Sequence, residues 1–180
     1  FAEAEIIESY VGQGVSEVNL SNLVTEVSLE ENARLQHYQI QTALPHCGYI
    51  SNIEVHQRRH SLYNHDNANF PGADFVRNDI NVRMDDPQVE GHLYGVLLLN
   101  GKQLVDNHTI VDHLKPHGES YEWYKTITQD ESTAVFNGKI FVREDAQKTN
   151  AFQQNNNLLL SDEATINSKP QLEIFADDAK

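Results

Sequence analysis

The sequence predicts an all-β fold of the β-solenoid type, on three observations. Apolar and polar residues alternate with period 2 along much of the chain, whereas the 3.6-residue period of an amphipathic helix is hard to find. A short corner-like pattern recurs, and turn-forming residues separate the apolar runs. With 180 residues, the chain is long enough to form one domain with a core of its own.

Alternation identifies the strands, because successive side chains of a strand point to opposite faces of the sheet. The best helical candidate is 119–127, but Tyr121, Trp123 and Tyr124 in that segment suit a strand at least as well. The clearest alternating segments are, in chain order, 24–29, 34–41, 50–55, 79–84 and 171–175.

A five-residue pattern predicts the corners between strands. It consists of an aliphatic residue, any residue, an acidic residue, a polar residue and Ala, and it occurs at 29–33, 142–146 and 160–164. A polar-rich strand follows each copy. Ala146 and Ala164 are 18 residues apart, near the lower edge of the roughly 20 residues or more that one solenoid coil takes.

Other polar segments predict turns and loops. Asn100-Gly101 and Asn137-Gly138 fit either a two-residue antiparallel hairpin or a solenoid corner, and the sequence leaves both open. The stretch 65–73 is the most loop-like, and a second loop is predicted at 85–88; both are expected to be insertions between coils. The amide run 153–157 fits either a hydrogen-bonded ladder between stacked coils or a solvated loop.

Charge excludes two classes of partner. Lys and Arg number 13 against 27 Asp and Glu, so the formal net charge is −14. Such a chain repels nucleic-acid phosphates and anionic membranes. Apolar runs such as 95–99 fall far short of the ~20 residues that span a bilayer. Cys47 is the only cysteine and cannot form an internal disulfide, which makes a cytoplasmic location the simplest expectation.

Nine histidines are many for this length, and three gather at His108, His113 and His117. Imidazole with neighbouring carboxylates suits a metal such as zinc or ferrous iron. However, His108 and His113 are five residues apart, so on one strand they face opposite sides, and Pro116 interrupts regular pairing before His117. A structural role, in hydrogen bonds to the backbone of turns, is therefore favoured over a metal site.

Three further groups also favour structural roles. Cys47 follows Pro45-His46 and is interpreted as a buried small side chain rather than an activated nucleophile. The basic cluster 56–60 is expected to be solvated or to pair with acidic corners of a neighbouring coil, with docking of a partner as the alternative. Acidic pairs are expected at exposed corners, where they keep a solenoid soluble: Glu30-Glu31, Asp85-Asp86 and Asp177-Asp178.

Several of these segments together resemble the SufB/SufD family of SUF-system iron–sulfur cluster assembly proteins, and most of all the core of its SufD branch. Segments 31–38, 106–109 and 135–140 resemble the entry and the middle of that core. The more specific matches are Ala146-Gln147-Lys148-Thr149-Asn150-Ala151 with 155–161, and Lys169-Pro170-Gln171-Leu172-Glu173-Ile174-Phe175-Ala176-Asp177-Asp178. Together these motifs span nearly the whole chain.

The resemblance implies a right-handed parallel β-helix, in agreement with the strands and corners. It also implies a non-catalytic scaffold subunit that pairs with a SufB-like subunit and a SufC-like ATPase. The iron–sulfur cluster would be assembled transiently in the parent complex, with no cofactor resident in this chain. The motifs that carry the family's known functional residues would lie beyond Lys180, so no catalytic, cofactor-binding or metal residue is assigned.

Residues 1–180 are expected to form a single β-helical core domain, an excerpt that lacks flanking N- and C-terminal segments. Association of the isolated chain into a homodimer is a further expectation, because open ends of a β-helix invite pairing. Two alternatives stay open. One is a β-helical polysaccharide lyase or epimerase that uses Asp, His and Arg in a surface groove, and the other is a passive structural solenoid.

Overall fold

A computed structural model describes residues 1–11, 19–42 and 45–179. They form twelve strands in two six-stranded sheets in which all pairing is parallel, and the described residues contain no helix, hence none that could cross a membrane. The strands are β1 (Glu3–Val11), β2 (Asn19–Leu29), β3 (Arg34–Thr42), β4 (Cys47–Gln57), β5 (Leu62–Asn69), β6 (Phe75–Met84), β7 (Glu90–Leu99), β8 (Leu104–His113), β9 (Glu119–Thr128), β10 (Thr133–Val142), β11 (Asn150–Leu159) and β12 (Thr165–Ile174).

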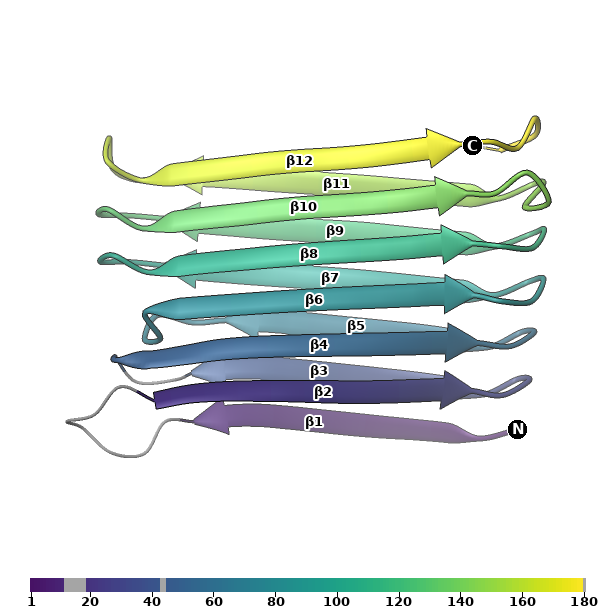
Figure 1. The fold of residues 1–180 in the computed structure, drawn as a ribbon, viewed down its shortest axis with the longest axis horizontal. Coiled ribbons are helices and arrows are strands. Elements are labelled where there is room, and N and C mark those ends of the chain that lie inside the picture. The colour runs from purple at the N-terminus through teal and green to yellow at the C-terminus, as the bar shows by residue number, and fades with distance from the viewer. Residues whose placement is uncertain (12–18, 43–44, 180) are drawn as a thin grey trace.

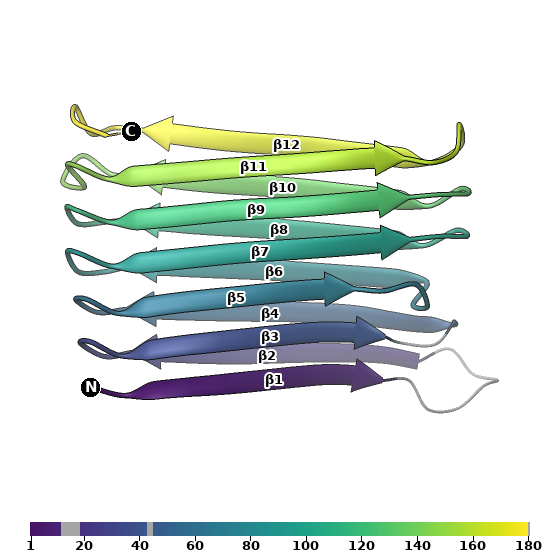
Figure 2. The same ribbon diagram turned by 180° about the vertical axis from the view of Figure 1, so that it is seen from behind.

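The chain alternates between the two sheets, so each coil consists of one strand from each. The odd sheet has the order β1-β3-β5-β7-β9-β11 and the even sheet the order β2-β4-β6-β8-β10-β12. Figure 1 shows the even sheet in front with its strands running to the right, while the chain rises from β1 to β12 and returns leftward behind; Figure 2 shows the odd sheet from the other side. This sense of winding is right-handed, which confirms the predicted right-handed parallel β-helix.

The register gives the length of a coil. Phe75 pairs with Leu104, and Leu104 with Thr133, so one coil takes 29 residues here. The interpretation of the 18-residue spacing between Ala146 and Ala164 as one coil was therefore wrong. Those two alanines lie at successive corners at opposite ends of the body, one after β10 and the other after β11, and they are separated by half a coil.

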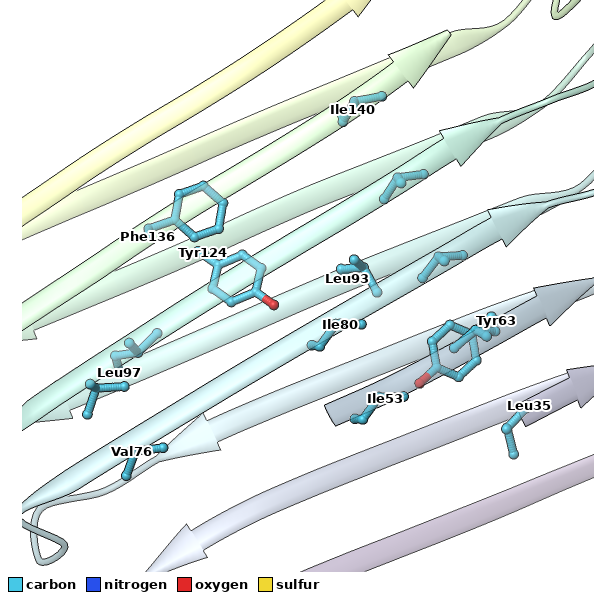
Figure 3. Packing of buried hydrophobic residues seen from close by; sticks show 14 of the residues in the cluster. Leu35, Ile53, Tyr63, Val76, Ile80, Leu93, Leu97, Tyr124, Phe136 and Ile140 are labelled. Atoms are coloured by element: carbon cyan, nitrogen blue, oxygen red, sulfur yellow. The ribbon is translucent and has the colours of Figure 1, made fainter. Parts of the chain in front are cut away.

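Alternating burial explains why these segments form strands. In β4 and β6, every second side chain points between the sheets and is buried, and its neighbours are more exposed. Ile53, Ile80 and Ile140 are each 0–1% exposed in this core, and Figure 3 shows such residues from both sheets packed together. Full burial of one such side chain stabilises the fold by roughly 1.5–3 kcal/mol. The expected strand at 119–127 is confirmed as β9.

The corners follow the predicted pattern. Segments 29–33, 142–146 and 160–164 all lie at the junction between one strand and the next. Asn32 at the first of these corners has φ 61°, the left-handed conformation that Asn tolerates better than most residues. The adjacent Ala33 amide donates to the Glu30 carbonyl at 3.0 Å, which closes the turn. Glu30-Glu31 and Asp177-Asp178 are exposed, as predicted, whereas Asp85 is only 17% exposed. The segment 85–88 is the corner between β6 and β7 rather than the predicted insertion between coils.

One of the two predicted Asn-Gly turns is confirmed. Gly101 has φ 61° and lies at the corner between β7 and β8, which belong to different sheets, so this turn is a solenoid corner rather than a hairpin. The prediction of a turn at Asn137-Gly138 was wrong, because both residues lie inside β10. Gly138 serves close packing there: an added Cβ would lie 2.6 Å from the Phe136 ring and 2.1 Å from Gln153 Nε2.

The loop prediction for 65–73 was largely wrong. His65 to Asn69 belong to β5, and only the residues after Asn69 form the connection to β6. His65, Asn67 and Asn69 point into the body and are buried, so their polarity reflects the interior rather than a solvated loop. The amide run 153–157 lies within β11, which excludes the loop alternative for it.

Candidate functional site

The three clustered histidines do not converge on one point. His113 is buried inside the solenoid, where its Nε2 lies 2.8 Å from Ser120 Oγ. His108 points outward from the same strand, as predicted, and its Nε2 lies 2.9 Å from Asp106 Oδ1. His117 is exposed at a corner with φ 62°. The partners of His108 and His113 are thus side chains rather than turn backbones, and no metal-holding group of three or more His, Cys, Asp or Glu exists among the described residues.

The basic cluster pairs with the acidic corner of the next coil, as one of its two interpretations predicted. His56 Nδ1 lies 3.0 Å from Asp85 Oδ2, and Arg58 Nη1 lies 3.9 Å from Asp86 Oδ2. Cys47 is buried at the start of β4, in agreement with a packing role. The ion pairs link neighbouring coils, and Cys47 packs in the core.

A buried polar cluster that the sequence analysis missed joins the first three strands of the odd sheet. His37 lies between two partners, with its Nε2 3.3 Å from Glu8 Oε2 and its Nδ1 3.0 Å from the hydroxyl of Tyr63. Tyr10 donates a hydrogen bond of 2.6 Å to the same Glu8 oxygen. The His65 ring lies 5.0 Å from that of His37, edge to face. These pairwise contacts therefore link one carboxylate, two imidazoles and two phenols.

Burial shifts the pKa of two members of this cluster, His65 and Tyr63. It lowers the pKa of His65 to about 3, with the neighbouring His37 as a smaller cause, and it raises the pKa of Tyr63 well above its usual value. His65 is therefore neutral at neutral pH. Neither of its ring nitrogens has a hydrogen-bond partner within the described part of the chain.

A second buried acid lies further along the odd sheet. Glu122 on β9 points into the body, where Gln153 of the neighbouring β11 donates a hydrogen bond to its Oε2. Its Oε1 has no hydrogen-bond partner among the described residues. Burial raises the pKa of Glu122 to about 7, so this carboxyl changes its protonation state near neutral pH.

Amide side chains connect the two sheets across the interior. Gln39 Nε2 donates to Ser51 Oγ at 2.8 Å, and Asn67 Nδ2 donates to Gln39 Oε1 at 2.6 Å. Asn78 accepts from Gln41 at 3.1 Å and donates to Asn107 at 2.7 Å. Such side-chain bonds fix the register of neighbouring coils, because a shifted coil would leave these buried groups unpaired.

Sequence reasoning missed these inward polar groups for a definite reason. Segment 34–41 alternates as predicted. Its inward positions carry His37, Gln39 and Gln41, whereas its outward positions include Tyr38 and Ile40. Hydropathy alone assigns such a strand the wrong face. A comparison with the neighbouring coil could have identified the inward face. His37 pairs with His65 and Gln39 pairs with Asn67, so polar residues recur at 28-residue intervals.

The interior can therefore hold protons and fix register, but its fully buried titratable groups are closed to solvent. His65, His113 and Glu122 are each 0% exposed. They cannot contact a macromolecular substrate without an opening of the coils. The surfaces that can meet another molecule are the outer faces of the two sheets, the corners and the two end strands.

Comparison with known proteins assigns the family. Residues 1–180 match the family model described as "SUF system FeS cluster assembly, SufBD core domain". Over 160 residues the chain is 34% identical to the iron-sulfur cluster assembly SufBD family protein slr0076 of Synechocystis, covering 89% of this chain and 35% of that protein.

Two further relatives match almost the entire chain. Protein ABCI7, chloroplastic, of Arabidopsis thaliana is 34% identical over 181 residues, which is 99% of this chain and 38% of that protein. Iron-sulfur cluster assembly protein SufD of Escherichia coli is 28% identical over 184 residues, 99% of this chain and 42% of that protein. The chain thus spans about two fifths of the length of these relatives. Since the family model covers residues 1–180, the chain belongs to the SufBD core family of SUF-system iron–sulfur cluster assembly proteins.

Proposed function

We propose that this chain is the core of a scaffold subunit of the SUF machinery, which pairs with a SufB-like subunit and a SufC-like ATPase during iron–sulfur cluster assembly. The observation that carries the proposal is the match of the SufBD core model to all 180 residues. The fold supports it, because stacked parallel coils make a stiff body with open strand edges at its two ends, and such edges pair readily with other β structure.

The scaffold acts without chemistry of its own. This part of the proposal is supported by the placement of the titratable groups His37, His65 and Glu122 inside the solenoid, where hydrogen bonds and burial give them structural roles. In the proposal, the iron–sulfur cluster is cargo of the parent complex and no cofactor resides in this chain. The complex works in the cytoplasm, and the isolated chain self-associates as a homodimer.

Co-purification tests the proposed partners. The full-length protein is co-expressed with the SufB-like and SufC-like proteins of the same organism, and the complex is isolated through a tag on this chain alone. Both partners are expected to be retained in a fixed ratio through size-exclusion chromatography. Light scattering on the protein expressed alone is expected to give the mass of a dimer.

A core variant provides the control. Ile80→Asp places a charge in the core, which costs several kcal/mol and is expected to abolish retention together with the fold. An exposed change such as Lys102→Ala is expected to leave retention unchanged, since Lys102 is 80% exposed. Loss of both partners from a folded wild-type protein would contradict the proposed assembly.

A further inference from the structure

The outer face of the odd sheet carries an aromatic column that is interrupted by one acid. The parallel register places Tyr38 beside Asp66, Asp66 beside Tyr94, and Tyr94 beside Trp123, one residue from each of β3, β5, β7 and β9. Neighbouring strands are about 4.8 Å apart, so these side chains follow one another along one face of the sheet. Asp66 therefore lies between two tyrosines, and the indole of Trp123 follows.

A hollow of about 370 Å³ opens over this column, and these four residues line it. The parallel column beside it contributes Ile40, Ala68, Val96 and Lys125. The hollow exists because the two short side chains, Asp66 and Ala68, both lie on β5 between longer neighbours. Its volume is at the lower end of the roughly 300–1,000 Å³ typical of ligand sites.

Asp66 has no cationic partner among the described residues. Its Oδ2 accepts a 2.5 Å hydrogen bond from Gln36 Nε2, which is a neutral donor. Burial is the largest influence on this carboxyl and raises its pKa. A partly buried carboxylate without a counter-charge favours the arrival of a cation from outside.

On the outer face of the even sheet, several acids are paired with arginines. Arg77 forms ion pairs with Asp79 at 2.7 Å and Asp106 at 2.5 Å, and Arg143 Nε lies 2.7 Å from Asp112. Asp66 differs from these arginine-paired acids, because it lies among aromatic rings without an ion pair in the described structure.

One ring of the column already contacts a cation. Lys125 Nζ lies 4.4 Å from the centroid of the Trp123 ring, a cation–π contact within the chain itself. This lysine forms no ion pair with Asp66 in the described structure. Trp123 remains 41% exposed and Val96 39% exposed, so the rim of the hollow is open. An open, aromatic rim is typical of protein interfaces, where Trp, Tyr and Arg contribute most of the binding energy.

From these contacts we infer that the hollow between Tyr38, Asp66, Tyr94 and Trp123 binds an arginine side chain presented by a partner protein. A guanidinium is planar and weakly hydrated, so it stacks on aromatic rings while it donates hydrogen bonds to a carboxylate. The net charge of −14 favours the approach of a basic segment. The inference stands on this face alone and does not depend on the partners proposed above.

Peptide titration of the full-length protein tests the inference. The probe is an acetylated and amidated Ala-Arg-Ala peptide, compared with the same peptide carrying neutral citrulline in place of arginine. The measured signal is the fluorescence of Trp123, obtained as the difference between the wild-type protein and a Trp123→Phe variant. Saturable binding of the arginine peptide is expected, about tenfold tighter than that of the citrulline peptide, because charge-assisted hydrogen bonds contribute on that scale.

Variants assign the binding to Asp66. Asp66→Asn keeps the shape of the side chain and is expected to weaken arginine binding about tenfold while citrulline binding is unchanged. Asp162→Asn removes an equal charge from an exposed corner and is expected to have no effect. Tyr94→Leu removes one aromatic wall, is expected to weaken binding severalfold, and serves as the second test if Asp66→Asn does not fold. An arginine peptide that does not saturate, or that binds Asp66→Asn as well as wild type, overturns the inference.

Discussion

Gly95 shows how closely single residues are fitted inside the solenoid. It lies on β7 directly beside Tyr124 of β9, and both face the interior. An added Cβ would lie 2.1 Å from Tyr124 Cδ1. The Tyr124 ring cannot retreat easily, because it is 1% exposed and packs against the Phe136 ring with centroids 4.7 Å apart. Glycine is therefore required here for space rather than for backbone conformation.

Gly95→Ala is expected to lower the free energy of unfolding by about 1–3 kcal/mol, the usual cost of overpacking a core. Urea unfolding followed by circular dichroism measures it. Gly101→Asn is the matched control, since no atom lies within 4 Å of a Cβ at Gly101 and Asn tolerates its φ of 61°. Equal stability of Gly95→Ala and wild type would show that the Tyr124 ring moves aside at little cost.

Glu122 gives a prediction with a defined pH window. Burial raises its pKa from 4.5 to about 7, so the folded state binds a proton that the unfolded state has lost between these values. Stability is then lost as pH rises from about 4.5 through 7, and the loss is complete above 7. Glu122→Gln keeps an acceptor for Gln153 and removes the buried charge.

The Glu122→Gln variant is expected to be about as stable as wild type at pH 4.5 and more stable by about 2–3 kcal/mol at pH 8. Urea unfolding of both proteins at the two pH values gives the difference, and the comparison cancels the titration of His65 and His113. A difference that does not change with pH would mean that Glu122 titrates near its ordinary pKa.

At the scale of elements, the corners share a left-handed backbone conformation that is adopted by residues of different chemical types. Residues with φ near 60° recur once per coil at the junctions that lead into the odd strands: Asn32, His60, Gln88, His117 and Lys148. Their amides bond to the corner of the next coil; for example, Gln88 N donates to the Pro116 carbonyl at 3.1 Å. His117 is thus one member of a stack of corner residues.

Gln88→Val is expected to lower the free energy of unfolding by about 1–2 kcal/mol, because a β-branched residue is poorly accommodated in the left-handed conformation. Gln88→Gly is expected to be neutral or stabilising by less than about 1 kcal/mol. The same exchange within a strand, Gln154→Val, supplies the control and is expected to be tolerated. Thermal unfolding of the three variants ranks them, and a tolerated Gln88→Val would show that the corner adopts another conformation.

Strands and corners were predictable because a pleated strand forces period 2 on the sequence, as in 50–55 within β4. The errors came from long-range packing. Asn137-Gly138 has the composition of a turn, but Gly138 serves the fit against Phe136 on an inner face. The stretch 65–73 has the polarity of a loop because its amides bond across the interior.

The hollow around Asp66 could not be predicted from the sequence, for a related reason. Tyr38, Asp66, Tyr94 and Trp123 are 28 or 29 residues apart in the sequence, and only the register of four strands brings them into one column. The assumed 18-residue coil could not align them. A search at the true coil length would have placed the acid between the aromatic residues.

At the scale of the whole molecule, the solenoid is nearly one-dimensional, and each strand contacts its sheet neighbours and the strand across the core. Side chains that face inward are covered from both sides only in the middle of the stack. Ile80 of β6 and Ile140 of β10 are 1% and 0% exposed, whereas Ile6 of β1 is 42% exposed and Ile174 of β12 is 46% exposed. In such an array, stability adds up from each repeat and its interfaces with its neighbours.

Hydrogen exchange on this 180-residue chain is therefore expected to show a gradient. Amides of β6 to β8 should exchange only through global unfolding, while those of β1 and β12 open locally at a lower free energy, because each has a sheet neighbour on one side only. Mass spectrometry of peptides from each strand measures the order. A partner strand that pairs with β12 would raise the protection of β12 alone and leave β8 unchanged. Uniform protection along the isolated chain would contradict the repeat-by-repeat picture and show that all the coils unfold as one cooperative unit.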